Sequence, residues 1–89
     1  MISVHVRVSG RVQGVYYRAF TKERAIALGI KGWVRNLPGG GVEAILEGER
    51  QKVGDLLKSM KSGPSGSLVL SMELSELECK GYKGFEIEY

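Results

Sequence analysis

The stretch "KGWVRNLPGGGVEAILEG", residues 31–48, decides how the rest of the chain must be arranged. Its first part, 31–36, contains Trp and Val, which favour strands. Its last part, 42–48, alternates apolar with acidic side chains, as a strand with one buried face does. Between them, "LPGGG" at 37–41 has the proline and glycines of a turn. Two strands joined by so short a turn pair as a hairpin, so a hairpin is predicted in the middle of the chain.

An amphipathic helix is predicted on each side of this hairpin. Residues 17–28 carry one apolar stripe, and residues 49–61 repeat apolar side chains at the i, i+3, i+4 and i+7 positions. Outside the helices, residues 2–9 and 68–74 alternate as half-buried strands do, and "FEIEY" at 85–89 forms a short final strand. The helical stripes consist of Tyr17, Thr21, Ala25 and Leu28 in the first helix and of Val53, Leu56, Leu57 and Met60 in the second.

The order of these elements indicates the fold. It is strand, helix, strand, strand, helix, strand, followed by the short final strand. Because each helix has one apolar face, we expect both helices to cover the same face of the sheet. The alternating strands suit a mainly antiparallel sheet whose other face is wetter, and each strand–helix–strand crossover should be right-handed. We therefore predict a single domain, residues 1–89, with the ferredoxin-like βαββαβ fold, an α/β (α+β) sandwich.

The composition narrows the environment and the partners. The net charge of +3 is too small to decide between nucleic acid, phosphate esters and no anionic partner. The N-terminus lacks the apolar core of a signal peptide, and no apolar run approaches the ~20 residues that span a membrane. Cys79 is the only cysteine, so it supports neither a disulfide nor a zinc site. We expect a cytoplasmic monomer with no membrane partner.

The loop before the first helix, "GRVQGVYYR" at 10–18, has the features of an anion site. The first N–H groups of a helix lack partners within the helix and lie at the positive end of its dipole, so they bind anions readily. Gly14 allows successive N–H groups to converge, and the planar guanidinium of Arg18 suits two oxygens of a phosphate. The alternative interpretation is that Gly14 only makes a turn and that Arg18 is solvated.

This loop contains no group that could attack a bound phosphate. Residues 10–18 include no Cys, Ser, Thr, Asp, Glu, His or Lys. If Arg18 were the arginine of a C-x5-R phosphatase loop, the nucleophile would stand at Val12, which is chemically inert. A phosphate bound here is therefore attacked by water or does not react.

Asn36, at the end of the first hairpin strand, has two interpretations. Before a proline and glycines it fits a turn residue, but its carboxamide could also donate to and accept from a water molecule or an oxyanion. Elsewhere, we expect Trp33 in the core and Glu43 and Glu47 in solvent. His5 is the only histidine, and it fits a structural or surface role on its strand rather than a metal site.

The segments "GRVQGVYYR" and "GWVRNLPGGGVEAILEG", with "GFEIEY" at the end, resemble the acylphosphatase family over essentially the whole chain. That family hydrolyses acyl phosphates, the mixed anhydrides of a carboxylic acid and phosphoric acid. The resemblance implies a small-molecule acyl phosphate as the partner, no cofactor and no metal. It also implies that Arg18 binds the phosphate, that Asn36 positions the attacking water and that the loop backbone cradles the phosphate. The cradle residues are Gln13, Gly14, Val15, Tyr16, Tyr17 and Arg18.

Two places depart from the family's pattern. Gly39 and Gly40 stand where the turn commonly carries Asp-Gly, which should loosen the hairpin tip rather than the site. Tyr16 and Tyr17 stand where a variable residue and usually Phe occur. We expect the ring of Tyr17 to pack into the core and the hydroxyl of Tyr16 to lie near the pocket.

The chemistry of an acyl phosphate explains why so few groups suffice. Its leaving carboxylate has a pKa of about 4 and departs without protonation. Phosphoryl transfer then requires mainly positioning and charge stabilisation. We therefore expect direct, metal-independent attack of water on phosphorus. The resemblance to the family implies that the proton of the water passes to a phosphate oxygen.

Two other functions remain open at this point. The first is a small RNA-binding module of ferredoxin-like fold, because "KGYKGFEIEY" is faintly similar to an aromatic RNA-binding strand. Glu86 and Glu88 count against it, since they would place negative charge near RNA phosphates, and we expect no nucleic-acid partner. The second is a non-catalytic acylphosphatase-like domain. Turnover of benzoyl phosphate would separate these alternatives from the enzyme.

Overall fold

The computed structural model describes residues 1–89 and has the predicted order of elements. Five strands form one sheet in the order β4-β1-β3-β2-β5. Neighbouring strands are antiparallel except for β2 and β5, which are parallel. The elements are β1 (Ile2–Arg11), α1 (Tyr17–Ala27), β2 (Lys31–Asn36), β3 (Val42–Gly48), α2 (Arg50–Ser62), β4 (Leu68–Leu77) and β5 (Phe85–Glu88).

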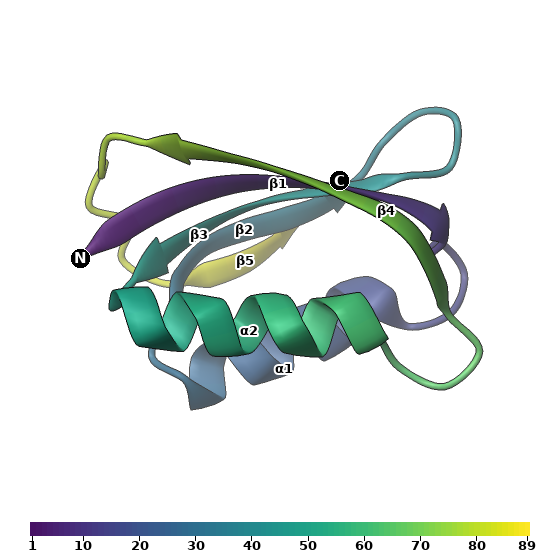
Figure 1. The fold of residues 1–89 in the computed structure, drawn as a ribbon, viewed down its shortest axis with the longest axis horizontal. Coiled ribbons are helices and arrows are strands. Elements are labelled where there is room, and N and C mark those ends of the chain that lie inside the picture. The colour runs from purple at the N-terminus through teal and green to yellow at the C-terminus, as the bar shows by residue number, and fades with distance from the viewer.

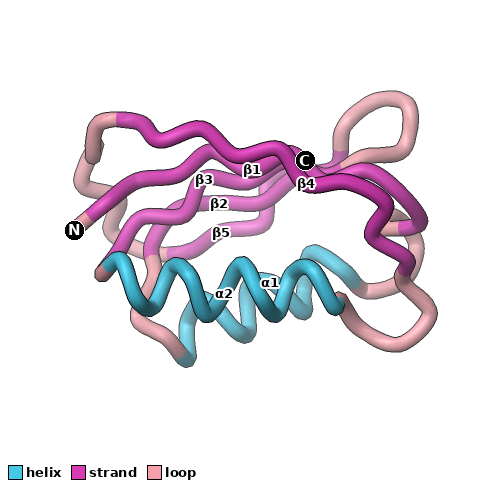
Figure 2. Tube along the Cα trace, viewed as in Figure 1, coloured by secondary structure: helices cyan, strands magenta, loops and turns pink.

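Both helices lie against one face of the sheet (Figure 1). Figure 2 shows the two resulting layers, with the strands on one side and the helices on the other. Helix α1 packs mainly against β2 and β5, whereas α2 packs against β3 and β4. Neither helix is long and apolar enough to cross a membrane. The predicted ferredoxin-like fold, with both helices on one face, is confirmed.

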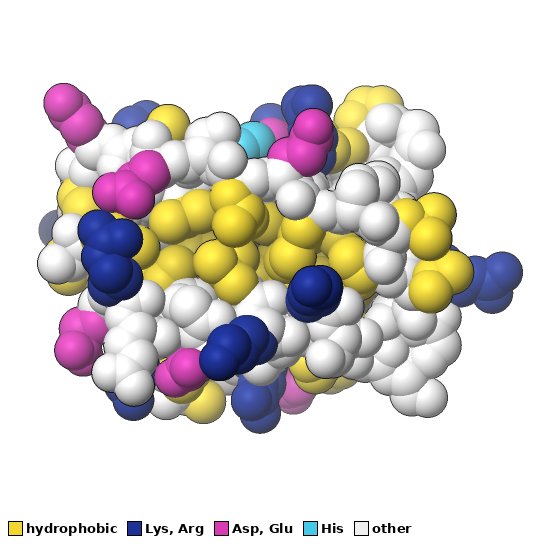
Figure 3. Space-filling model, in the orientation of Figure 1, with side chains coloured by type: hydrophobic (Ala, Val, Ile, Leu, Met, Phe, Trp, Pro, Cys, Tyr) yellow, Lys and Arg dark blue, Asp and Glu magenta, His cyan; other side chains and the backbone are white.

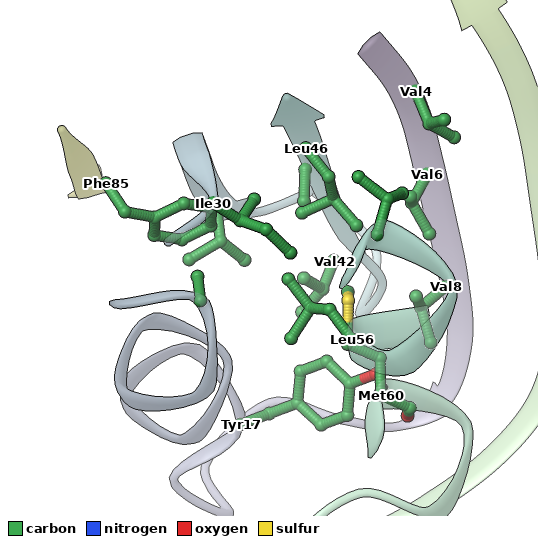
Figure 4. Packing of buried hydrophobic residues seen from close by; sticks show 14 of the residues in the cluster. Val4, Val6, Val8, Tyr17, Ile30, Val42, Leu46, Leu56, Met60 and Phe85 are labelled. Carbon is green, nitrogen blue, oxygen red and sulfur yellow. Dashed lines mark hydrogen bonds between the residues drawn. The ribbon is translucent and has the colours of Figure 1, made fainter. Parts of the chain in front are cut away.

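The core lies between the helices and the sheet. Figure 4 shows the ring of Tyr17, at the start of α1, pointing into this core beside Leu56 and Met60 of α2. The side chain is 1% exposed, and its hydroxyl donates to the main-chain oxygen of Met60 at 2.6 Å. Burial raises the pKa of the Tyr17 phenol far above its usual value, because the phenolate would lose its hydration. The ring therefore has the predicted core position and fastens the start of α1 to α2.

Strand β1 extends two residues beyond its predicted end. We expected a strand at 2–9 and a loop from Gly10, but pairing with β4 continues to Arg11 through a shift of register at Gly10. Gly10 has a φ of 127°, and a Cβ atom there would lie 2.1 Å from the main-chain oxygen of Leu68. The extra residue of this irregularity, Leu70, belongs to β4, and Gly10 has no side chain to continue the apolar alternation of β1, which is why the sequence pattern stopped before the strand did.

The apolar side of β4 is more exposed than its alternation predicted. The strand itself is confirmed, but Leu70 and Leu74 are 72% and 53% exposed. Because β4 is an edge strand, α2 leaves a hollow of about 280 Å³ beside it. Figure 3 shows the apolar side chains gathered in this band between α2 and β4. The apolar residues that line the hollow are Ile2, Val4, Val53, Leu57 and Leu74.

The face of the sheet that lacks helices buries two glutamates that we had placed in solvent. Glu43 and Glu47 are 6% and 2% exposed. Glu43 Oε2 lies 2.7 Å from His5 Nε2, and its Oε1 accepts from Arg35 Nε at 2.6 Å. Arg35 also stacks 5.0 Å from the ring centroid of Trp33, which is half-buried on this face rather than in the core. The prediction for Glu43 was wrong because its partners, His5 and Arg35, come from the neighbouring strands β1 and β2. Trp33 faces away from the helices because the adjacent Val34 takes the core side of β2.

Glu47 fastens the segment between β4 and β5 to the sheet. Its oxygens accept from the main-chain N–H groups of Lys80 and Gly81, each at 2.8 Å, and of Tyr82 at 3.1 Å. Burial alone would raise the pKa of this carboxyl, but the hydrogen bonds outweigh burial and hold the pKa below its usual value. The same balance lowers the pKa of Glu43, with His5 and Arg35 as its partners. Both carboxylates therefore have structural partners on this face.

Candidate active site

The loop between β1 and α1 enters the helix through two residues with left-handed backbone. Gly14 has a φ of 73° and Tyr16 a φ of 68°. Tyr16 is the only non-glycine residue with a positive φ. It occupies the N-cap position of α1, but its side chain makes no capping hydrogen bond. A bulky residue in this conformation costs on the order of 1–2 kcal/mol. The first turn of α1 therefore keeps N–H groups that no side-chain cap satisfies.

The first turn of α1 lines a cavity of about 230 Å³. This volume is below the roughly 300–1,000 Å³ of pockets that take drug-sized ligands, so the cavity suits a small molecule. Its walls come from four places in the chain: the β1–α1 loop, the start of α1, the end of β2, and β5 with the residue that follows it. The lining residues are Val12, Gly14, Tyr16, Tyr17, Arg18, Ala19, Asn36, Ile87 and Tyr89.

The cavity brings together five of the predicted site residues, namely Gly14, Tyr16, Tyr17, Arg18 and Asn36. Arg18 is the only side chain with a formal charge among the lining residues. Its position in the first turn of α1 adds to the positive end of the helix dipole, and no acidic residue lies in that turn. The cavity therefore favours a small anion.

Gln13 and Val15 do not line the cavity, although we predicted them as substrate-binding residues. The side-chain Nε2 of Gln13 donates to the main-chain oxygens of Leu37 at 2.8 Å and of Gly41 at 2.7 Å. The side chain of Val15 packs against the hydrophobic core. Their side chains thus hold the loop in place. Only the main-chain N–H groups of these two residues remain available to bind a phosphate.

Asn36 reaches the cavity from the end of β2. Its Oδ1 is the only buried side-chain nitrogen or oxygen without a hydrogen-bond partner. Leaving a buried acceptor unpaired costs about 1–3 kcal/mol, so such an atom beside a cavity indicates a place where a donor from a ligand or water is used.

The ring of Tyr89 lies against the predicted phosphate-binding arginine. The guanidinium carbon of Arg18 is 5.1 Å from the centroid of this ring, a cation–π distance. Tyr89 follows β5, and the parallel pairing of Arg35 with Glu88 places it beside the strand end that carries Asn36. We missed Tyr89 and Ile87 as cavity residues, because nothing in the sequence shows that the final strand pairs with β2.

No group of three or more His, Cys, Asp or Glu side chains is arranged to hold a metal ion. The site thus consists of one guanidinium, one carboxamide, the N-terminus of a helix and apolar walls.

Comparison with known proteins shows which family the chain is similar to. The sequence profile of the acylphosphatase family matches residues 4–87. The chain belongs to the acylphosphatase family. An acylphosphatase of Methanothrix thermoacetophila is 67% identical over 88 residues, which cover 99% of this chain and 98% of that relative. The crystal structure of the acylphosphatase from Bacillus subtilis has a TM-score of 0.98 at 32% identity and covers 100% of both chains.

Acylphosphatase membership confirms the resemblance and makes the chain an enzyme that hydrolyses small-molecule acyl phosphates. It favours this function over the RNA-binding module. The same fold also occurs within a larger protein: full-length HypF in its phosphate- and nucleotide-bound form has a TM-score of 0.92 at 30% identity. That match covers 99% of this chain but only 12% of HypF, whereas this chain spans nearly the whole of its acylphosphatase relative.

Proposed function

We propose that the cavity binds the phosphate group of an acyl phosphate and that water held by Asn36 attacks the phosphorus directly. Main-chain N–H groups of residues 13–18 and the guanidinium of Arg18 hold the phosphate. The reaction uses no metal and forms no covalent phosphoenzyme. The observation that carries this proposal is the meeting of Arg18, the uncapped helix N-terminus and the unpaired Oδ1 of Asn36 at one small cavity.

Arg18 and the helix N-terminus supply the charge stabilisation. In phosphoryl transfer, negative charge is spread over the three equatorial oxygens of the transferring group. A planar guanidinium contacts two such oxygens, and N–H groups of the first helical turn can meet the third. The ring of Tyr89 restricts where the Arg18 guanidinium can lie. Donors that are already in place need no reorganisation during the reaction, which is why they lower the barrier.

Asn36 supplies the position of the nucleophile. The torsion at the end of an Asn side chain is broad, so a small rotation presents Oδ1 to a water molecule in the cavity. Oδ1 then accepts a hydrogen bond from the water and leaves a lone pair of the water directed at phosphorus. A carboxamide is no base near neutral pH, so the proton of the water passes to an oxygen of the phosphate.

The leaving group makes a general acid unnecessary. The departing carboxylate has a pKa of about 4, so it leaves as the anion when the P–O bond breaks. This agrees with the lining of the cavity, in which no carboxyl, imidazole or amine side chain is available to donate a proton.

Isotope labelling tests the site of attack. A single turnover of benzoyl phosphate in ¹⁸O-labelled water should place the label in inorganic phosphate and leave benzoate unlabelled. Label in benzoate would mean attack on the acyl carbon, which contradicts a site that holds and attacks the phosphate.

Two controls test the remaining parts of the proposal. A chelator should leave the rate unchanged, and a loss of activity that metal restores would disprove metal independence. With phosphate-radiolabelled substrate, acid-quenched protein should carry no label. Retained label would show a covalent intermediate. Absence of any turnover would instead support the non-catalytic alternative.

We further propose that the enzyme works as a cytoplasmic monomer. Arg18, Asn36 and the start of α1 meet at the cavity within a single chain, which supports a monomer. The single cysteine, Cys79, is exposed and free, which suits a reducing compartment. Sedimentation at working concentration tests whether the enzyme is a monomer, and a stable dimer would contradict that part of the proposal.

A further inference from the structure

A cavity of about 430 Å³ lies between the helix-free face of the sheet and residues 78–82 of the segment that joins β4 to β5. Its volume falls within the roughly 300–1,000 Å³ of pockets that take drug-sized ligands. It shares no lining residue with the cavity at the first turn of α1. This sheet cavity is therefore separate from the proposed phosphate site.

The floor of the sheet cavity comes from four adjacent strands. Leu77 of β4 pairs with Ser3 of β1, and Trp33 of β2 pairs with Ile45 of β3. The next residues along β1, β2 and β3 belong to the core, so these side chains point away from the helices. Leu77 is 47% exposed, although it is apolar and lies in a hollow. A ligand in the sheet cavity would remove this apolar surface from water.

The aromatic residues of the sheet cavity are attached to the sheet without a ligand. Glu47 accepts from the main-chain N–H of Tyr82 at 3.1 Å and from those of the two residues before it at 2.8 Å. The ring of Trp33 lies 5.0 Å from the guanidinium of Arg35, which donates to Glu43 at 2.6 Å. Both aromatic side chains are half-buried. Walls that are in place before binding reduce the entropy that binding costs.

The charges at the sheet cavity do not select an ion. Glu78 and Lys80 are the only lining side chains with a formal charge, and their charges have opposite signs. The other lining side chains are aromatic, aliphatic, or the small side chains of Ser3 and Cys79. The lining thus suits a ligand without net charge, whereas the cavity beside Arg18 favours an anion.

We propose that the sheet cavity is a second ligand site, which binds a small, planar aromatic molecule without net charge. The ligand stacks on the rings of Trp33 and Tyr82, as aromatic pairs do, and covers Leu77. Binding here leaves the cavity at the first turn of α1 free. The inference goes beyond the proposed function and does not depend on it.

Titration of indole into the ¹⁵N-labelled full chain tests the site by nuclear magnetic resonance. Trp33 is the only tryptophan, so its side-chain N–H gives a single resonance. Indole should shift this resonance and the main-chain N–H resonances of residues 77–82 saturably, with a dissociation constant on the order of 1 mM. Shifts confined to residues 12–19 and 36 would overturn the inference, because those residues belong to the other cavity. Absence of saturable shifts at millimolar indole would also overturn it.

Two exposed leucines of β4 provide a matched pair of variants. Leu77 lines the sheet cavity and Leu70 does not, so Leu77→Ser should weaken indole binding severalfold while Leu70→Ser should leave it unchanged. Trp33→Leu should weaken binding by roughly two- to tenfold, the contribution of one aromatic pair, as followed by the main-chain resonances. Equal affinity in Leu77→Ser and the wild type would overturn the inference.

A comparison of three ligands tests the preference for an uncharged molecule. Indole should bind more tightly than indole-3-acetate or tryptamine, because each ion loses hydration beside lining charges that cancel. Tighter binding of either ion would overturn this part of the inference. Inorganic phosphate should not displace indole, and displacement would overturn the separation of the two sites.

Discussion

The Nε2 atom of Gln13 lies 2.7 Å from the main-chain oxygen of Gly41, so that one side chain joins the proposed phosphate cradle to the β2–β3 turn. A second hydrogen bond from the same atom reaches the main-chain oxygen of Leu37. Leu37 directly follows Asn36. Gln13 therefore sets the position of the carboxamide of Asn36 relative to the loop that is proposed to hold the phosphate.

Replacing Gln13 should weaken this joint. Both carbonyl oxygens keep another partner, since Leu37 N–H donates to Gly41 and Gly40 N–H donates to Leu37. Gln13→Ala should therefore lower the free energy of unfolding by only about 1–2 kcal/mol, with a larger loss in kcat than in phosphate binding. Gln13→Glu should be worse, because a carboxylate would face two carbonyl oxygens. Urea unfolding measures both variants, and a Glu variant as stable as the wild type would contradict the joint.

Arg18 is expected to be indispensable for turnover. Removal of one preorganised donor costs ~10²–10³ in kcat, and Arg18→Gln should lose at least that much. It should also weaken inorganic phosphate as a competitive inhibitor. Arg18→Lys should recover little, because a point charge cannot contact two oxygens as a planar guanidinium does. Near-normal turnover of Arg18→Gln would remove this residue from the mechanism.

Asn36 is expected to act on water rather than on phosphate binding. Asn36→Ala should reduce kcat severely while inorganic phosphate still binds, because Arg18 and the helix N-terminus remain. Isothermal titration of phosphate into the folded variant, set beside its kcat, separates the two effects. A phosphate affinity that falls as far as turnover would make Asn36 a binding residue instead.

The buried carboxylate of Glu47 should make stability depend on acid pH. Its pKa lies below the usual 4.5 in the folded protein, so its stabilisation is present above about pH 4.5 and is lost as the pH falls through the lowered pKa. Glu47→Gln should cost about 2 kcal/mol near neutral pH, since three N–H groups lose a charged acceptor. It should also flatten the fall in stability as the pH drops below 4.5. Urea unfolding across this range tests the prediction, which fails if the variant and the wild type decline in parallel.

The sequence by itself determined the elements and led to the hypothesis of an anion site. Alternation over Ile2–Val8 and the helical spacing of Val53, Leu56 and Met60 report which side chains need burial, and burial is a local requirement that each segment expresses alone. The residues of the loop before α1 predicted an anion site, since a glycine and an arginine before a helix also act locally, through the backbone geometry of their own segment. The cavity shared by Arg18 and Asn36 followed from the family resemblance.

Only the tertiary structure decided which segments meet. Glu43 and Glu47 looked solvated because the side chain of His5 and the N–H groups of Lys80 and Gly81 lie far away in the sequence. Tyr89 became a neighbour of Arg18 only because β5 pairs with β2, and Gln13 turned away from the cavity because the β2–β3 turn offered it two carbonyl oxygens. Hydrogen bonds and stacking depend on the distance between groups in space, and the pairing of distant strands sets that distance.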